Sequence, residues 1–154
     1  MSEYQRSTRE CILDTMNPAL ATAVRQHIET HQLGTVLTNT LFCGETTSTR
    51  QKKGLFGRKS ETIHTGFLLA PPWLIWATAK EGEPAAVLAV RLRDIQVQDY
   101  QRSEMYKLMP DSGLNITGLR QSDEGVGTAF IGLGPEPAGQ TFRERLRQAV
   151  DQAK

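Results

Sequence analysis

The sequence predicts a mainly β domain of antiparallel strands that is closed by one C-terminal helix. From about Leu41 to Gly134, short apolar stretches alternate with polar turns, and no helical stretch separates one from the next. Strands that follow one another without an intervening helix favour an antiparallel sheet or barrel. The amphipathic stretch from Phe142 to Val150 then ends the protein, and such a helix is suited to cover an open edge of a sheet.

Size and composition indicate a globular protein without a strong field of one sign. A chain of 154 residues buries a core without disulfides, and a net charge of +1 gives no general attraction to nucleic acid or membrane. Cys11 and Cys43 are far apart in sequence and match no metal or redox spacing, which indicates a reducing compartment. The polar start is not a signal peptide, and the longest apolar stretch, residues 65–79, is interrupted by two prolines. We therefore expect a cytoplasmic protein with no nucleic-acid partner and no integral membrane segment.

The N-terminal segment is expected to be a helical extension, residues 1–34, of a β domain that covers residues 35–154. Asn17 followed by Pro18 is typical of a helix start, because proline has no amide to leave unpaired there. Apolar residues at every fourth position then predict a helix over residues 18–32. The apolar stripe of this helix consists of Leu20, Val24 and Ile28.

Alternation of apolar and polar residues, with many threonines, predicts a succession of strands in the β domain. Residues 51–59 are expected to form a turn, and Pro71-Pro72 to break the sheet because neither residue donates to a ladder. The stretch of small and β-branched residues at 85–92 predicts a buried strand. The predicted strands cover residues 35–38, 41–50, 62–69, 73–79, 85–92, 95–97, 114–119 and 126–133.

The closing helix has one apolar stripe that is expected to face the inside of the sheet. Phe142, Leu146 and Val150 recur at every fourth position. Thr141 with Glu144 fits a capping box at the start of this helix.

The pattern of elements resembles pleckstrin-homology-like domains, especially those of the GRAM and bacterial PH type. The segment from Thr65 to Ala77 resembles the central hairpin of that family, and Val90 to Val97 resembles the strand that follows it. The resemblance covers roughly residues 35–152 and implies a barrel of two orthogonal antiparallel sheets with about seven strands, in which the C-terminal helix plugs one open end. The N-terminal helix is an addition to that plan.

The turn at residues 51–59 is the sharpest functional candidate, because four cations flank two large apolar residues. Each cation near an anionic membrane contributes about 1 kcal/mol, and exposed Leu and Phe side chains suit insertion into the interface. The resemblance implies the same place, since lipid-binding family members hold phosphate with basic residues of this loop. Glu61 and His64 on the following strand depart from that pattern, and the alternative is a solvated hairpin whose charges prevent edge pairing. The candidate contact residues are Lys52, Lys53, Leu55, Phe56, Arg58 and Lys59.

Two further functions remain open from the sequence. In the first, an oligomeric assembly protein packs the stripe of the N-terminal helix against another copy, with Trp76 as a second contact residue. In the second, a small enzyme or nucleotide binder uses the string from Gly134 to Thr141, which approaches a phosphate-binding loop but has Gln140 in place of its lysine. His27 and His31 have a metal-chelating spacing but lack further ligands nearby in sequence.

The sequence contains no recognisable catalytic motif, and we expect neither a cofactor nor a bound metal. The resemblance implies a non-enzymatic binding module that contacts a protein partner or an anionic lipid surface. This would place the protein in the cytoplasm, with peripheral membrane attachment as an option, and it leaves a homo-oligomer open.

Overall fold

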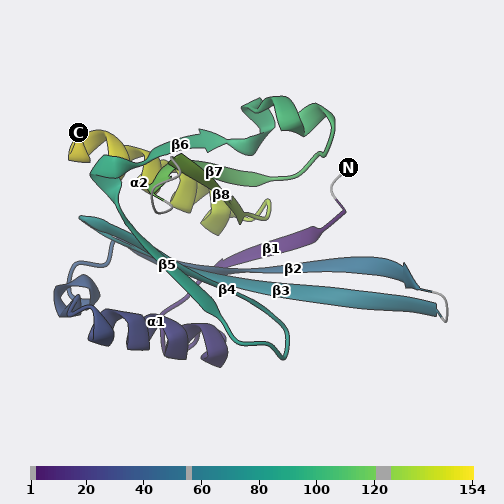
Figure 1. Cartoon of the computed structure of the whole chain (residues 1–154), viewed down its shortest axis with the longest axis horizontal. Helices are drawn as coiled ribbons and strands as arrows, with labels where there is room; N and C mark the ends of the chain where they lie inside the picture. Colours follow the sequence, from purple (N-terminus) through teal and green to yellow (C-terminus); the bar gives the residue numbers. More distant parts are fainter. Residues whose placement is uncertain (1–2, 55–56, 121–125) are drawn as a thin grey trace.

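The computed structural model describes residues 3–54, 57–120 and 126–154 and contains two antiparallel sheets and two long helices (Figure 1). Four short 3-10 helices connect or precede strands: η1 (Gly34–Leu37), η2 (Leu92–Asp94), η3 (Tyr100–Arg102) and η4 (Glu104–Lys107). The main elements are β1 (Gln5–Glu10), α1 (Pro18–Thr30), β2 (Phe42–Gly54), β3 (Gly57–Ala70), β4 (Trp73–Lys80), β5 (Ala86–Arg91), β6 (Gln96–Asp99), β7 (Gly113–Arg120), β8 (Val126–Gly132) and α2 (Pro137–Ala153).

The predicted mainly β class with antiparallel pairing is confirmed, but the predicted barrel is wrong. A five-stranded sheet has the order β1-β2-β3-β4-β5, and a three-stranded sheet has the order β6-β7-β8. The β4–β5 ladder ends at the pair Trp73 and Arg91, and the chain then turns through η2 into the other sheet. Among the described strands no ladder joins the two sheets, so they pack face to face without closing.

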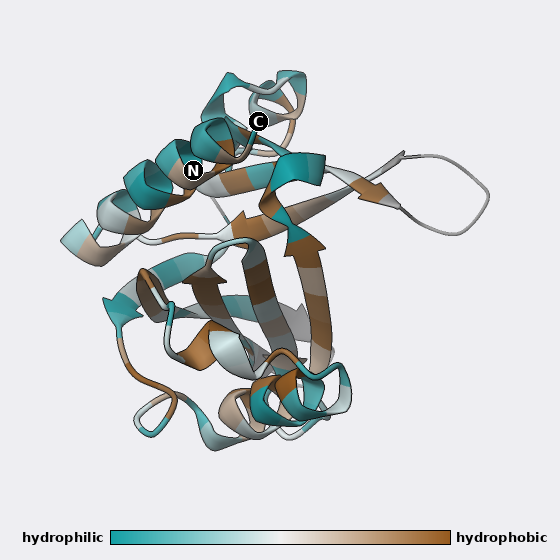
Figure 2. Cartoon of the chain, turned by 90° about the vertical axis from the view of Figure 1, so that its left-hand side faces the viewer, coloured by the Kyte–Doolittle hydropathy of each residue, from teal (hydrophilic) through white to brown (hydrophobic). Residues whose placement is uncertain are grey.

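The molecule has three layers, with the five-stranded sheet in the middle. α1 covers one face of this sheet, and α2 with the three-stranded sheet covers the other (Figure 1). Consecutive residues Phe67, Leu68 and Leu69 of β3 are each at most 2% exposed, because successive side chains of a strand point to opposite faces and both faces are covered. Figure 2 shows the resulting hydrophobic stretches on the strands of this sheet.

The predicted N-terminal helix and its apolar stripe are confirmed. The side chain of Asn17 accepts a hydrogen bond from the amide of Ala19, as expected of an N-cap. Leu20, Val24 and Ile28 are at most 4% exposed and pack in one core with the α1-facing residues of β3 and β4. The stripe is thus buried within its own chain, and an oligomer contact through these three residues stays a prediction.

The inward stripe of the closing helix is confirmed as well. Phe142, Leu146 and Val150 are at most 5% exposed, and the Phe142 ring lies 4.3 Å from that of Phe67 between centroids. The helix starts earlier than expected, at Pro137, so the capping box predicted around Thr141 is wrong. The start is instead fixed by tertiary contacts, described below.

Three local predictions differ from the structure. Residues 35–38 fall in η1 and its C-cap rather than in a strand. The ladder of β2 and β3 continues to the pair Gly54 and Gly57, so most of segment 51–59 is strand rather than turn. β5 is an edge strand with β4 as its one ladder partner, and it is half-exposed rather than buried.

Residues 1–16 were expected to belong to a helical extension, and no strand was predicted there, but the structure places β1 in this segment. β1 pairs with β2 along the register from Gln5 opposite Thr49 to Glu10 opposite Gly44. The N-terminal segment therefore contributes an edge strand of the main sheet as well as α1.

Candidate functional site

One buried residue of β1 connects the main sheet to the start of α2. Thr8 is 2% exposed, and its amide donates to Oε1 of Glu136 at 2.8 Å. Its hydroxyl accepts from the amide of Gly134 at 2.8 Å and lies 2.8 Å from the hydroxyl of Thr46. Glu136 is the N-cap residue of α2, so β1 holds the start of this helix in place.

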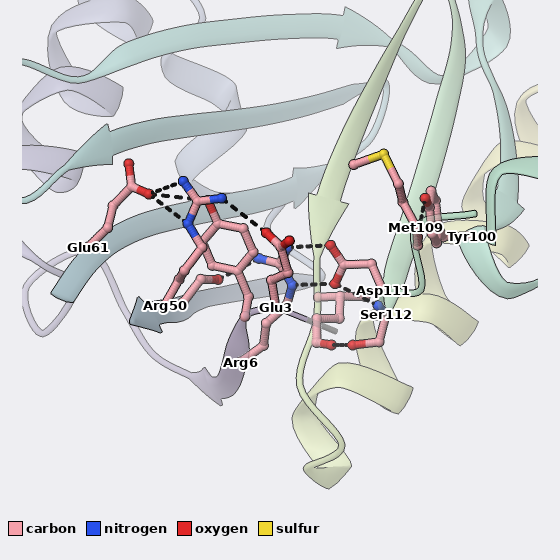
Figure 3. Close-up of polar contacts among 11 residues, drawn as sticks. Glu3, Arg6, Arg50, Glu61, Tyr100, Met109, Asp111 and Ser112 are labelled. Atoms are coloured by element: carbon pink, nitrogen blue, oxygen red, sulfur yellow. Dashed lines mark hydrogen bonds and ion pairs between the residues drawn. The ribbon is translucent and has the colours of Figure 1, made fainter. Parts of the chain in front are cut away.

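Arg6 is two residues earlier on the same face of β1 and is held in a single orientation. Its Nε and Nη2 donate to the two carboxylate oxygens of Asp111 at 2.8 and 2.6 Å, and its Nη1 donates to the hydroxyl of Ser48 at 2.6 Å (Figure 3). The guanidinium lies close to the backbone of Gly132, where an added Cβ would be 2.3 Å from Nη1. The Arg6 side chain is 11% exposed, and the bidentate geometry is the strong form of an arginine–carboxylate pair.

A second ion-pair group extends from Arg6 along the sheet. Arg50 donates to Oε2 of Glu61 through Nε and Nη2 at 3.1 and 2.7 Å, and through Nη1 to Glu3 at 3.2 Å (Figure 3). Lys80 Nζ lies 3.2 Å from Oε1 of Glu61, and the Arg50 guanidinium lies over the ring of Tyr4. The charges in this group compensate one another.

Arg143 of α2 is buried but incompletely compensated. Its side chain is 10% exposed, and its Nε lies 3.5 Å from Oδ1 of Asp99, beyond hydrogen-bond geometry. The same carboxylate pairs with Arg147 at 3.0 Å, so one anion serves two guanidinium groups. Burial lowers the pKa of Arg143, Asp99 opposes this shift and Arg147 adds to it. Nε and Nη2 of Arg143 are buried and have no hydrogen-bond partner in the described part of the chain.

Arg6 and Arg143 line the same pocket of about 420 Å³, which we name the arginine pocket. It lies between the N-terminal segment, η3 with the residue before β7, and the segment that leads into α2. The described residues of its wall include two guanidinium groups and no carboxylate. The lining residues are Tyr4, Arg6, Gln101, Ser112, Gly134, Pro135, Gln140 and Arg143.

The composition of this wall suits an anionic group. Guanidinium donors match carboxylate and phosphate oxygens in planar, often bidentate contacts, and the Gln101 and Gln140 amides add uncharged donors. A phosphate-binding loop is less consistent with the backbone here. The amides of Gly134 and Gly139 donate to Thr8 and to the Glu136 carbonyl, so neither is free to cradle a phosphate.

Neither arginine was predicted from the sequence to belong to a site. Arg6 lies in a segment without a clear hydrophobic pattern, and Arg143 is one of several charged residues of the last helix, a composition typical of a solvated helix face. A signal was present for Arg143, because position 143 is three residues before Leu146 and seven before Val150, on the border of the apolar stripe.

The cationic hairpin predicted as a contact surface is only partly described. The backbone register places Lys52 opposite Lys59 and Lys53 opposite Arg58 at the end of the β2–β3 hairpin. These strands run past the ends of their neighbours, since β1 pairs no further than Thr49 and β4 no further than Ile63 (Figure 1). Leu55 and Phe56, and the side chains of the four cations, lie outside the described part of the chain.

The two tryptophans point to opposite faces of β4, as their spacing predicts. Trp76 is 4% exposed in the core beneath α2, while Trp73 is partly exposed with Arg91 over its ring. Trp76 is thus used for packing within the chain, and its role as a contact residue for another copy stays a prediction.

The histidine pair on α1 shows no further ligands. The rings of His27 and His31 lie 4.2 Å apart between centroids, and the pKa of His27 is lowered by burial and by the charge of His31. Across residues 3–54, 57–120 and 126–154, no group of three or more histidine, cysteine or acidic side chains is arranged to hold a metal. Within the same residues, neither helix has the length and apolar content to span a bilayer.

No family model, curated protein or solved structure matches the chain.

Proposed function

We propose that the protein is a non-enzymatic binding module with pleckstrin-homology-like architecture, and that the arginine pocket holds an anionic group of its ligand. The order of elements supports the architecture. Four consecutive antiparallel strands, β2 to β5, precede three more, β6 to β8, and α2 follows them. The family plan has about seven strands in two sheets and then a helix, so β1 and α1 are additions to it.

One observation carries the ligand class: a buried Arg143 whose charge is incompletely compensated. Burying a charge is costly unless hydrogen bonds and a counter-charge replace its water. The Nε of Arg143 lies 3.5 Å from a shared carboxylate, and within the described residues neither Nε nor Nη2 has a hydrogen-bond partner. A phosphate or carboxylate group in the pocket supplies what is missing, next to Arg6, which is already oriented by Asp111.

The ligand class is tested with inorganic phosphate and acetate as separate probes. We expect at least one of them to raise the midpoint of thermal unfolding, because an anion that binds only the folded state stabilises it. The NMR signal of Arg143 Nε–Hε should shift in the same titration and identify the group that binds.

Arg143→Gln should weaken binding by about tenfold or more, since a hydrogen bond to a charged group is worth about 1.5–3 kcal/mol. Arg93→Gln is the charge-matched control, because Arg93 is 64% exposed in η2 and does not line the pocket. If neither probe moves the Arg143 signal, or if both variants weaken binding equally, the pocket is not the anion site.

A second candidate function, attachment to an anionic membrane, is favoured by the hairpin register. The backbone register places four cationic positions in two successive opposite pairs at the end of this hairpin. An anionic surface attracts such a concentration of basic residues. Co-sedimentation at low salt with phosphatidylserine vesicles, against neutral phosphatidylcholine vesicles, tests it, and Lys52→Glu with Lys59→Glu should abolish the preference. Equal sedimentation with both vesicles would end this candidate.

A further inference from the structure

Cys11 and Cys43 are distant in sequence but directly opposite in the structure. The Cys11 amide donates to the Cys43 carbonyl at 3.0 Å and so continues the β1–β2 ladder past the pair of Glu10 and Gly44. Hydrogen-bonded neighbours in an antiparallel ladder have Cα atoms about 5.5 Å apart, inside the range of about 4.4–6.8 Å that disulfides need. Both side chains belong to the core beneath α1, and both are free thiols.

We propose that Cys11 and Cys43 form a modification site at which a small-molecule disulfide, of the oxidised glutathione class, oxidises the pair to an intramolecular disulfide. This goes beyond the binding function and does not depend on it.

The reaction proceeds by two thiol–disulfide exchanges. The Cys11 thiolate attacks one sulfur of the small disulfide, whose sulfur–sulfur bond breaks and releases one thiolate. The Cys43 thiol then loses its proton, and its sulfur attacks Cys11 in the mixed disulfide and releases the second small thiol. Two protein thiols are oxidised, and one small disulfide is reduced to two thiols.

The surroundings of the two thiols indicate that Cys11 makes the first attack on the small disulfide. A hydrogen bond between the thiols lowers the pKa of Cys11 and raises that of Cys43, and burial with the charge of Glu45 partly opposes the shift at Cys11. The thiolate is the attacking species, so the thiol that ionises more readily reacts first.

The pair is close to the surface despite its burial. Cys11 is 9% exposed and Cys43 7% exposed, and Cys43 lines a pocket of about 290 Å³. Ile12 and Leu37, on the wall of this pocket, are 61% and 51% exposed, which gives a small reagent a path to Cys43, and Cys11 lies opposite Cys43 in the ladder.

The disulfide would close a ring from residue 11 to residue 43 that contains the whole of α1. Closing a ring of this length restricts the unfolded chain and stabilises the native state. We therefore expect oxidation to tie β1 and α1 more firmly to the main sheet.

The test uses the full-length reduced protein and oxidised glutathione. We expect an intact mass lower by two hydrogen atoms, a monomer on size exclusion, and no reactive thiol after denaturation. The midpoint of thermal unfolding should rise by about 5–15 °C and return to its starting value with dithiothreitol.

Two single variants separate the steps. Cys43→Ser should stop at a glutathione adduct on Cys11, whereas Cys11→Ser should form an adduct several-fold more slowly. Far-UV circular dichroism confirms that each variant is folded, and the double Cys→Ala variant gives the midpoint without any thiol. Unreacted thiols, two glutathione adducts on one chain, a disulfide between chains, or a midpoint that does not rise on oxidation would each overturn the proposal.

Discussion

The two faces of the five-stranded sheet are packed in different ways. Beneath α1 the core is aliphatic, with Leu20, Val24 and Ile28 against residues such as Ile75 and Ala77. Beneath α2 it is aromatic, and three rings, those of Phe42, Phe67 and Phe142, contact one another.

The polar groups differ as well. The α2 face ends in a rim where β1, the segment before β7 and the start of α2 meet, and this rim holds Arg6, Arg143 and the arginine pocket that they line. On the α1 side, the buried carboxylate of Glu45 is satisfied by Arg9 and by the amide of Asn17. The sheet face that one helix covers is filled by apolar side chains, whereas the place where three elements meet leaves space for charged side chains.

The largest expected effect is the loss of the aromatic cluster. Phe142→Ala should lower the free energy of unfolding by about 3–5 kcal/mol, because it removes a fully buried ring and leaves a cavity. Leu20→Ala on the other face should cost about 2–5 kcal/mol by the same mechanism. Urea denaturation of both variants checks the comparison, and a smaller loss for Phe142→Ala than for Leu20→Ala would contradict it.

The losses of stability on replacing Arg6 and on replacing Arg143 should differ, because the charge of Arg6 is compensated and that of Arg143 is not fully compensated. Arg6→Met leaves Asp111 without its bidentate partner and should cost about 2–4 kcal/mol, somewhat less than a fully buried pair because Asp111 is 19% exposed. Arg143→Met removes a desolvated charge that its neighbours do not satisfy, so stability should stay within about 1 kcal/mol of the wild type or rise.

Chemical denaturation in a buffer without phosphate, sulfate or carboxylate ions keeps the pocket free of added ligand during this comparison. Equal losses for the two variants would show that Arg143 is as well compensated as Arg6, and would weaken the proposed anion site.

A smaller effect is expected at the start of α1. Asn17→Ala should cost about 1 kcal/mol, because the side-chain cap on the Ala19 amide is lost while the Glu45 contact to the Asn17 amide remains. Asn17→Ser, which keeps a capping oxygen, is the matched control in the same denaturation experiment. A loss as large as that of Leu20→Ala would mean that the cap, rather than the stripe, holds this helix.

The smallest expected effect is a pH dependence from His27. Its pKa in the folded state lies below the ordinary value of 6.5, so the unfolded chain binds more protons in this range. The contribution to stability is present above the unfolded pKa and is lost as pH falls through the folded pKa. His27→Gln should therefore reduce the loss of stability between neutral and mildly acidic pH, and an unchanged pH profile would show that His27 does not contribute.

The sequence predicted the elements whose signals are local. The Asn17–Pro18 start, the stripe of α1 and the inward stripe of Phe142, Leu146 and Val150 are each set by neighbours within a few turns. The strands around the Pro71-Pro72 break were also predicted, because proline excludes a ladder wherever it stands.

The errors arose where the partner of a segment is distant in sequence. β1 has no pattern of its own and is a strand because β2 offers it an open edge. The start of α2 is fixed by Thr8, which lies 128 residues from Glu136. Burial of Trp76 depends on α2 and the second sheet, which no window around β4 contains.

The amino-acid sequence by itself determined the antiparallel β class and the two amphipathic helices, because periodicity and chain breakers act over a few residues. Tertiary structure alone decided that Arg6 meets Arg143 in one pocket and that Cys11 faces Cys43, because both pairs depend on which strands and layers become neighbours. The physical reason is that hydrophobic periodicity specifies which side of an element is buried but not which element covers it.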